Sequence, residues 1–394
     1  MIMKRLFILA AAVAMFAACT EKSLVNTGPD NERIPLSISL SNGEVHPATR
    51  GINTAYQSTQ LIASNTMNLF IRTASNTGAK TATYEQDALT PTSLTNITYG
   101  STDCADFTTS TALYYPDVKS TEICLYAYAP NTIGLAPTTI STFDIDLSSD
   151  RDQTADADYL KNDIIWGSQG TSTNKVSAAA FATAKTAAPA AGVTSGAYIG
   201  TGASSDPKIL IPMQHVASKV IINLIPSGMA LTQLQGKTVK YFVDYTKGDL
   251  NLATGEIRTY GASASNYDAG QAITLTSNLG NGVTTATDTG AYSSDGTSLT
   301  GYTCCAVVLP QKINAGADNA TPGSSADLIE LYIDSTTSYK YKKSGITELL
   351  PGKVYTYNIT VTASGFHVTT TVTDWTEDTW GTATSPATGS ATLQ

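Results

Sequence analysis

The feature that most restricts the fold of this chain is the shortness of its apolar runs. From residue 51 onward these runs are bounded by Gly, Pro, Asn, Asp or Ser, and residues 143–147 alternate apolar and acidic side chains. Residues 328–333 and 354–361 have similar strand patterns. Short alternating runs separated by turn residues, without a long amphipathic helix pattern, are typical of β-sandwiches. The sequence therefore predicts an all-β protein.

Composition supports β structure and excludes one class of partner. Charged residues make up only 14% of the chain, and tyrosine, with 20 copies, is the main aromatic residue. Thr and Tyr favour the half-buried surfaces of strands. The net charge is −9, and Lys and Arg form no cluster. Nucleic-acid binding needs cations that neutralise phosphate, so we exclude it.

Two low-complexity stretches, residues 167–206 and 261–301, interrupt the strand pattern. Both contain mainly Ala, Ser, Thr and Gly, so we expect surface loops or hairpin excursions. We divide the chain after the first stretch, into one sandwich over residues 51–206 and a second over residues 207–381. Residues 382–394 are small and polar, which predicts a flexible tail.

The N-terminus has the pattern of an exported lipoprotein. Lys4 and Arg5 precede an apolar stretch that is too short to span a bilayer, as in a signal peptide over residues 1–18. The stretch ends in FAAC, with Cys19 in the setting of a lipid attachment site and Phe16 where an aliphatic residue is usual. Acyl chains would then hold the protein at a membrane. The alternative is an ordinary signal peptide, cut nearby, with an incidental cysteine.

Residues 19–50 contain one isolated strand pattern followed by a possible cleavage site. Pro35 lies within the pattern, and because it cannot donate a ladder hydrogen bond it suits an edge strand. The bond between Arg50 and Gly51 lies among small residues after the strand. Arg33 is the rival cleavage site, but it precedes the strand. The apolar positions of the pattern are Ile34, Leu36, Ile38 and Leu40.

Patterns that carry chemistry are weak. The three histidines are far apart, without a zinc-binding or HExxH spacing, so we predict no catalytic residue, cofactor or metal site. Six aspartates between residues 144 and 158 could hold calcium, but the glycine and closing glutamate of an EF-hand are missing. A hydrolase whose carboxylates meet only in the fold stays open. The cysteines at 104, 124, 304 and 305 allow three pairings. Cys304 and Cys305 are adjacent in an apparent strand, and we expect them to be buried small side chains instead of a redox pair.

Six short motifs, in order along about 250 residues, resemble the fimbrillin family, which comprises the subunits of donor-strand pili and their accessory and tip relatives. The motifs are YAYAP at 126–130, DYL at 158–160 leading into DIIWG at 163–167, MQHVASKV at 213–220, VVLPQ at 307–311, PGKVYTY at 351–357 and TDW at 373–375.

The resemblance implies two tandem transthyretin-like (Greek-key) β-sandwich domains and a lipidated precursor delivered to the outer membrane. It also implies cleavage by an arginine-specific protease, which removes the first strand and leaves a groove for a strand of another pilin subunit. On this chain the lipid would go on Cys19, the cut would fall between Arg50 and Gly51, and residues 34–40 would be the removed strand. The protein would support adhesion and biofilm as part of an extracellular fimbria.

Two further expectations come with the resemblance. The candidate donor strand has Phe366, Val368 and Val372 as its apolar residues, and shaft, tip and accessory roles stay open. Ser335, in the triplet DST, resembles an O-glycosylation acceptor. The alternative function is a surface lipoprotein that binds glycans without polymerising. In that case the tyrosines would line a sugar-binding face rather than fill the core.

Overall fold

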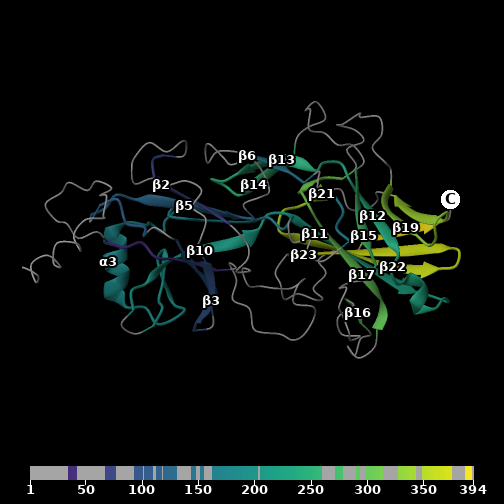
Figure 1. The fold of residues 1–394 in the computed structure, drawn as a ribbon, viewed down its shortest axis with the longest axis horizontal. Helices are drawn as coiled ribbons and strands as arrows, with labels where there is room; N and C mark the ends of the chain where they lie inside the picture. Colours follow the sequence, from purple (N-terminus) through teal and green to yellow (C-terminus); the bar gives the residue numbers. More distant parts are fainter. Residues whose placement is uncertain are drawn as a thin grey trace, which may run out of the picture.

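The protein is described by a computed structural model of residues 1–394. The structure describes residues 34–41, 67–76, 93–100, 102–109, 112–117, 119–130, 143–147, 151–154, 162–202, 205–259, 271–277, 290–292, 299–313, 327–342, 348–374 and 387–392. Figure 1 shows the strands of the first half and those of the second half side by side along the longest axis.

The first half forms a nine-stranded sheet whose main path has the order β2-β5-β7-β10-β1-β4-β3, with the β8–β9 hairpin attached to β10. Apolar residues on one face of this sheet pack around Leu40, Leu125 and Ile211. The strands are β1 (Ile38–Ser41), β2 (Asn68–Thr73), β3 (Ser93–Tyr99), β4 (Thr102–Thr108), β5 (Ile123–Ala129), β7 (Ile165–Gln169), β8 (Thr194–Ser195), β9 (Tyr198–Ile199) and β10 (Lys208–His215).

The first strand is an interior strand of this sheet, not the edge strand that Pro35 suggested. β1 runs parallel to β10 on one side and antiparallel to β4 on the other. Pro35 precedes β1 and forms an isolated antiparallel bridge with Tyr114. Its missing N–H therefore lies outside the ladders that join β1 to β10 and β4. A proline next to a strand, rather than in it, places no limit on the strand's position.

The second half is a sandwich of two sheets, with the orders β16-β17-β11-β22-β23-β24 and β15-β12-β19-β20. The prediction of an all-β sandwich protein is therefore confirmed. The strands are β11 (Ser218–Pro226), β12 (Thr238–Val243), β15 (Gln271–Thr276), β16 (Gly290–Tyr292), β17 (Leu299–Val308), β19 (Asp327–Tyr332), β20 (Ser338–Lys342), β22 (Lys353–Thr362), β23 (Gly365–Asp374) and β24 (Ala387–Thr392). A short 3-10 helix, η1 (Leu231–Leu234), precedes β12.

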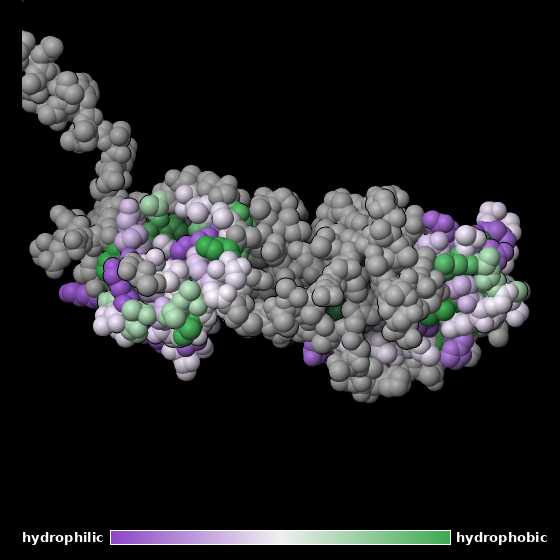
Figure 2. Space-filling model, turned by 90° about the horizontal axis from the view of Figure 1, so that it is seen from below, coloured by the Kyte–Doolittle hydropathy of each residue, from purple (hydrophilic) through white to green (hydrophobic). Residues whose placement is uncertain are grey.

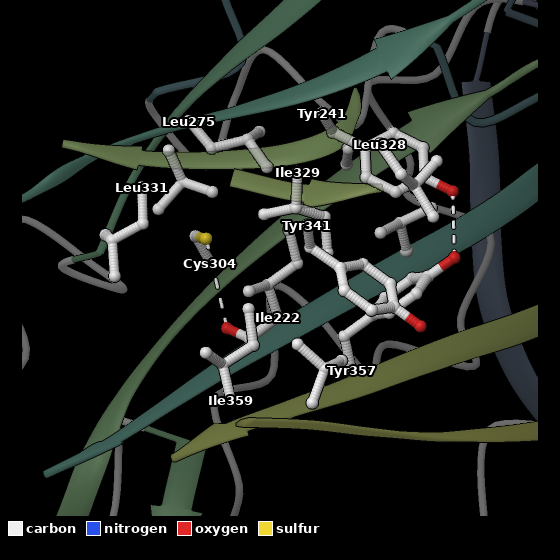
Figure 3. Close-up of a cluster of buried hydrophobic side chains, with 14 of the residues drawn as sticks. Ile222, Tyr241, Leu275, Cys304, Leu328, Ile329, Leu331, Tyr341, Tyr357 and Ile359 are labelled. Carbon is white, nitrogen blue, oxygen red and sulfur yellow. Dashed lines mark hydrogen bonds between the residues drawn. The ribbon is translucent and has the colours of Figure 1, made fainter. Parts of the chain in front are cut away.

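Tyrosines fill much of the core between these two sheets (Figure 3). The Tyr241 and Tyr357 hydroxyls lie 3.1 Å apart, and both side chains are fully buried. Tyr341 lies beside them in the same core and is 2% exposed. A buried phenol keeps its hydroxyl satisfied by such pairing. These residues therefore fill the core, as opposed to lining a sugar-binding face.

A third core joins the two halves. It combines residues such as Tyr126 and Trp166 from the first sheet with Leu250 and Val354 from the second half. The Trp166 Nε1 donates a hydrogen bond of 2.8 Å to the Leu252 carbonyl. The three-stranded sheet at this place has the order β14-β13-β6, and a two-stranded sheet joins β18 to β21. Their bounds are β6 (Phe143–Asp146), β13 (Lys247–Asn251), β14 (Glu256–Thr259), β18 (Gln311–Lys312) and β21 (Glu348–Leu349).

The chain changes sheet later than the predicted boundary after residue 206. β10 pairs with β1, β7 and β9 of the first sheet. β11, the next strand along the chain, belongs to the six-stranded sheet of the second half. The change therefore falls between His215 and Ser218. In addition, β6 pairs with β13 of the second half. Composition marked the boundary at the end of a loop, whereas strand pairing across long sequence separations determines which sheet a segment joins.

The low-complexity stretch 167–206 contains a helix, α3 (Ala178–Ala187), and the β8–β9 hairpin. The sequence predicted loops and hairpins here, and the helix was not expected. Alanine has the highest helix propensity, and the Ser177 hydroxyl caps the helix by accepting a hydrogen bond from the Ala180 N–H. Phe181 packs between Tyr115 and Tyr198, with ring centroids at 5.8 and 6.0 Å. Phe181, together with the buried Ala178 and Ala184, therefore docks this alanine-rich helix on the sheet.

The C-terminal segment contains a strand where the sequence predicted a flexible tail over residues 382–394. β24 pairs antiparallel with β23 and is the last strand of the six-stranded sheet. Small polar residues can occupy such a strand because the backbone supplies the ladder hydrogen bonds.

The four cysteines of the described residues are buried and form no disulfide with one another, and the burial of Cys304 and Cys305 agrees with the sequence-based expectation. Cys304 and Cys305 are neighbours in β17, and only Cys304 belongs to the core between the sheets, where its Sγ contacts the Ile222 carbonyl oxygen at 3.9 Å (Figure 3). Adjacent strand residues point to opposite faces, which separates the two thiols. Burial raises the pKa of the Cys304 thiol well above its ordinary value, so it stays protonated and unreactive.

Candidate functional site

The segment that the sequence singled out before Arg50 lies in the middle of the first sheet. Leu36, Ile38 and Leu40 are 6%, 2% and 0% exposed, and Ile34 is partly buried against the same core. Alternate apolar residues thus point to one face of the strand and fill the core, as the pattern predicted. Whether the strand is removed stays a prediction.

The backbone of this segment is held along its whole length by residues that are far away in sequence. The Leu36 N–H donates to the Leu113 carbonyl at 2.8 Å, and the Tyr115 N–H donates to the Ile34 carbonyl at 3.1 Å. From Ile38 onward, β10 and β4 supply the ladder partners on the two sides. Neither β10 nor β4 is next to β1 in the sequence. The segment is therefore held in the sheet in the way that a separate peptide would be held.

The apolar face of β1 sits in positions formed by both neighbouring strands. Ile38 is in register with Phe107 of β4 and Ile209 of β10, and Leu40 is in register with Ala105 and Ile211. All six residues belong to one core. Residues that are in register on adjacent strands share a face and contact each other. The two neighbours therefore form a groove with places for large aliphatic side chains.

The opposite face of β1 carries a polar cluster centred on Asp106 of β4. The Asp106 carboxylate accepts hydrogen bonds from the Ser39 hydroxyl at 3.1 Å and from the Tyr99 hydroxyl at 2.9 Å. It also forms an ion pair with the ammonium group of Lys208 on β10. The Asp106 and Lys208 side chains are 15% and 26% exposed. Ser39 itself is fully buried. We call Ser39, Tyr99, Asp106 and Lys208 the Asp106 cluster.

Tyr99 is a permanent donor in this cluster. Burial raises the pKa of Tyr99 well above its ordinary value, and its hydrogen bond to Asp106 raises the pKa further. The phenol therefore keeps its proton and donates to the carboxylate throughout the physiological range. The Lys208 ammonium also lies 5.8 Å from the centroid of the Tyr99 ring, within the range of a cation–π contact.

Sequence reasoning missed the Asp106 cluster. Lys208 and Asp106 are 102 positions apart, and they meet because β10 and β4 are the two neighbours of β1. Their sequence surroundings carry no motif. Only the strand order, known from the tertiary structure, could have identified the pair.

The processing residues lie outside the described part of the chain. These are Cys19, Arg50 and Gly51, as well as the rival Arg33. In sequence, Arg50 lies between β1 and β2, so a cut there would separate β1 from every later strand.

The candidate donor strand lies inside the second sandwich. It is part of β23, which pairs with β22 on one side and β24 on the other. Phe366 and Val368 are 4% and 0% exposed, and Val372 is partly buried against the same core. In this structure the strand closes its own sandwich, and its departure would open that core.

Ser335 lies at the exposed tip of the β19–β20 hairpin. The preceding Asp334 holds the turn, because its carboxylate accepts hydrogen bonds from the N–H groups of Thr336 and Thr337 at 2.8 and 2.7 Å. It also accepts from the Thr336 hydroxyl at 2.9 Å. The serine is thus presented on a turn held by these hydrogen bonds, and its modification stays a prediction.

Two of the sequence motifs meet at the junction of the halves. β10 pairs with β7, which places Met213 opposite Gly167 and His215 opposite Ile165. The His215 Nδ1 lies 2.7 Å from the Asp163 carboxylate. A Cβ on Gly167 would lie 2.4 Å from the Pro212 carbonyl oxygen, so this position requires a glycine. The motifs therefore mark close packing of strands.

No group of His, Cys, Asp or Glu among the described residues has the geometry of a metal site. No helix in the same residues is long and apolar enough to cross a bilayer. Figure 2 shows hydrophobic and hydrophilic residues interspersed over the coloured parts of one face of the molecule.

Among solved structures, the chain resembles a "putative cell adhesion protein" from Bacteroides ovatus ATCC 8483, with a TM-score of 0.51 and 14% identity over 88% of this chain and 99% of that one. At this identity the likeness concerns the fold alone. A fimbrial protein from Bacteroides vulgatus ATCC 8482 (TM-score 0.41, 13% identity, 88% and 100% covered) is also similar. So is the tip fimbrial protein Mfa3 from Porphyromonas gingivalis (TM-score 0.41, 8% identity, 86% and 99% covered).

Comparison with curated protein sequences gave no significant match. The model of the fimbrillin-like family, in contrast, matches residues 54–375, which is most of the chain. The matched region includes every motif on which the resemblance was based. This chain therefore belongs to the fimbrillin-like family.

Proposed function

We propose that this protein is a non-enzymatic structural subunit of a bacterial surface fimbria. It is exported as a lipoprotein carrying its lipid on Cys19, and an arginine-specific protease cleaves it after Arg50. It then polymerises when a strand of another pilin subunit takes the place of β1. Family membership supports the role in a fimbria, and the N-terminal sequence supports export and lipidation.

One observation carries the strand replacement: β1 is an interior strand held only by distant parts of the chain. A cut at Arg50 would leave it attached by non-covalent contacts alone, between β10 and β4. The family match begins at residue 54, after Arg50, and leaves β1 out. The matched region thus does not include the segment that we propose is replaceable.

The energetics favour replacement over loss. Burial of Leu36, Ile38 and Leu40 contributes about 5–9 kcal/mol together, as an upper estimate. Whole domains are stable by only about 5–15 kcal/mol, so a subunit without β1 would be marginal. It would also expose unpaired backbone groups on β10 and β4, and such edges bind an added strand. A neighbouring subunit that supplies the strand restores both the apolar burial and the backbone hydrogen bonds.

The test follows the mature protein from cells and the polymer together. Mass spectrometry should find an N-terminus at Gly51, and unboiled samples should form ladders on denaturing gels. The variant Arg50→Gln should keep its lipidated N-terminus at Cys19 and give no ladder. Arg33→Gln is the matched control and should behave as the unaltered chain.

Two outcomes would contradict the proposal. A correctly cleaved chain that stays monomeric would exclude polymerisation by strand replacement. A mature N-terminus at Cys19 in the unaltered protein, with a melting temperature raised by a polysaccharide, would favour the glycan-binding lipoprotein instead.

A further inference from the structure

The ion pair between Asp106 and Lys208 passes over β1. The two residues belong to β4 and β10, which flank β1, and neighbouring strands lie about 4.8 Å apart. The pair therefore spans two strand spacings on the face that Ser39 shares. Lys208 stands one residue before Ile209, the partner of Ile38, so its side chain runs diagonally toward Asp106, the partner of Ser39.

The pair limits what can stand at position 39. Ser39 is fully buried, and its hydroxyl donates to Asp106 at 3.1 Å. A large side chain would need the space of the ion pair, and a side chain without a hydroxyl would remove one donor from a largely buried carboxylate. On the other face, the flanking positions 38 and 40 hold large aliphatic residues in the core.

We propose that the Asp106–Lys208 pair selects the strand that completes this sheet. The accepted strand carries a small hydroxyl residue between two large aliphatic residues, with the small residue at the position of Ser39. This inference rests on the proposed strand replacement and identifies the chemistry of the partner segment.

The selection rule applies to the strands at the C-terminal end of the chain. β23 of a second copy would place His367 between Phe366 and Val368, and an imidazole is too large for the space beside the ion pair. β24 has the sequence ATGSAT and offers no large aliphatic residue to the core face. The accepted strand therefore resembles β1 itself and is neither β23 nor β24.

The experiment measures peptide binding to the full chain after cleavage at Arg50. Fluorescent peptides copy residues 34–41, either unaltered or with Ser39→Ala or Ser39→Leu, and a fourth copies residues 366–372. Fluorescence polarisation gives each dissociation constant. Loss of a hydrogen bond to a charged group predicts roughly tenfold weaker binding for Ser39→Ala. Ser39→Leu and the 366–372 peptide should bind more weakly still.

The groove variant Lys208→Ala separates selection by the ion pair from ordinary burial. It removes the side chain that passes over position 39, so the Ser39→Leu peptide should regain most of its lost affinity. Circular dichroism of the uncleaved variant checks that it folds. A bulky peptide that stays weak on this variant would overturn the role of the pair.

The remaining outcomes distinguish the two proposals. Equal binding of the unaltered and Ser39→Leu peptides would overturn the selection and leave strand replacement intact. No binding of the unaltered peptide would overturn strand replacement, and the selection with it.

Discussion

Leu40 shows how one side chain secures a segment that has no sequence neighbour in its sheet. It is fully buried between Ala105 and Ile211, which come from two different strands. Neither contact is local, so the burial of Leu40 reports directly on whether β1 is in place. The residue therefore gives a sensitive measure of the attachment of the first strand.

Replacing Leu40 by alanine should lower the free energy of unfolding of the full chain by about 2–5 kcal/mol, because a buried leucine leaves a cavity. Urea unfolding followed by fluorescence measures the change. Ser37→Ala is the control, since Ser37 is exposed and its loss should change stability by less than about 0.5 kcal/mol. Equal effects of the two variants would show that β1 is not seated in the core.

Asp334 makes a pH-dependent contribution to the β19–β20 turn. Hydrogen bonds from the Thr336 N–H, the Thr336 hydroxyl and the Thr337 N–H lower the pKa of Asp334 from its ordinary value of 3.8. A carboxyl group whose pKa is lower in the folded state stabilises the fold above its unfolded pKa, and this stabilisation disappears as the pH falls through the folded pKa.

The variant Asp334→Asn should therefore lose less stability than the unaltered chain when the pH is lowered below 3.8. Thermal unfolding at several pH values measures the difference. Ser335→Ala keeps the carboxylate and should retain the normal pH dependence. Identical acid profiles for Asp334→Asn and the unaltered chain would exclude this contribution.

At the scale of elements, the position of β1 determines how the first sheet holds together. In the described part of the sheet, β4 pairs with β1 and β3 only, so the β3–β4 hairpin joins the other strands through β1. An interior strand is a poor candidate for fraying, yet here it is the one before the predicted cleavage site. Its loss would therefore remove the backbone ladder that joins the hairpin to the rest of the described sheet, and leave side-chain contacts such as the Asp106–Lys208 pair to hold it beside the open groove.

The turn between β13 and β14 shows how the two halves fit together. Gly255 has a φ of +74°, and a Cβ there would lie 2.3 Å from Trp166 Cε3 of the first sheet. Gly228 has a similar φ of +70°, and a Cβ there would meet no atom within 4 Å. Both glycines have a positive φ, but only a Cβ at position 255 would clash with Trp166. The two positions therefore form a matched pair.

Gly255→Ala should destabilise the chain more than Gly228→Ala. The shared cost of positive φ is about 1–2 kcal/mol, and the clash with Trp166 adds about 1–3 kcal/mol. Urea unfolding of both variants measures the difference. Equal destabilisation would mean that the turn does not pack on Trp166.

At the scale of the whole molecule, the halves share the core around Trp166 but depend differently on β1. The core between the two sheets of the second half contains no residue of β1, whereas the core of the first sheet contains Ile38 and Leu40. Removal of β1 should therefore loosen one half and spare the other.

Hydrogen exchange read by mass spectrometry should show this difference when the full chain is compared with the chain cleaved after Arg50. Amides of β3, β4 and β10 should exchange faster after cleavage, because local opening costs less without β1. Amides of β12 and β22 should keep their protection. The Arg50→Gln chain treated with the same protease is the control. Faster exchange throughout the second half would contradict the expectation that only the first half depends on β1.

Alternation along single segments determined much of the fold from sequence alone. It predicted an all-β protein, the strand pattern that begins at Ile34 and the burial of its alternate residues, because side-chain direction in a strand depends only on local backbone geometry. The same local evidence missed α3, in which Phe181 is the one bulky apolar residue among alanines. It also missed β24, whose small polar residues carry no alternation.

The partners of each strand were decided by the tertiary structure. The interior place of β1, the membership of β10 in the first sheet and the meeting of Asp106 with Lys208 all depend on pairing between segments up to about 170 residues apart. A local pattern states that a strand has an apolar face, but it does not name the neighbours or the register. For this protein, the sequence determined that a strand precedes Arg50. Only the fold showed that the strand fills a groove lined on one face by aliphatic side chains and crossed on the other by an ion pair.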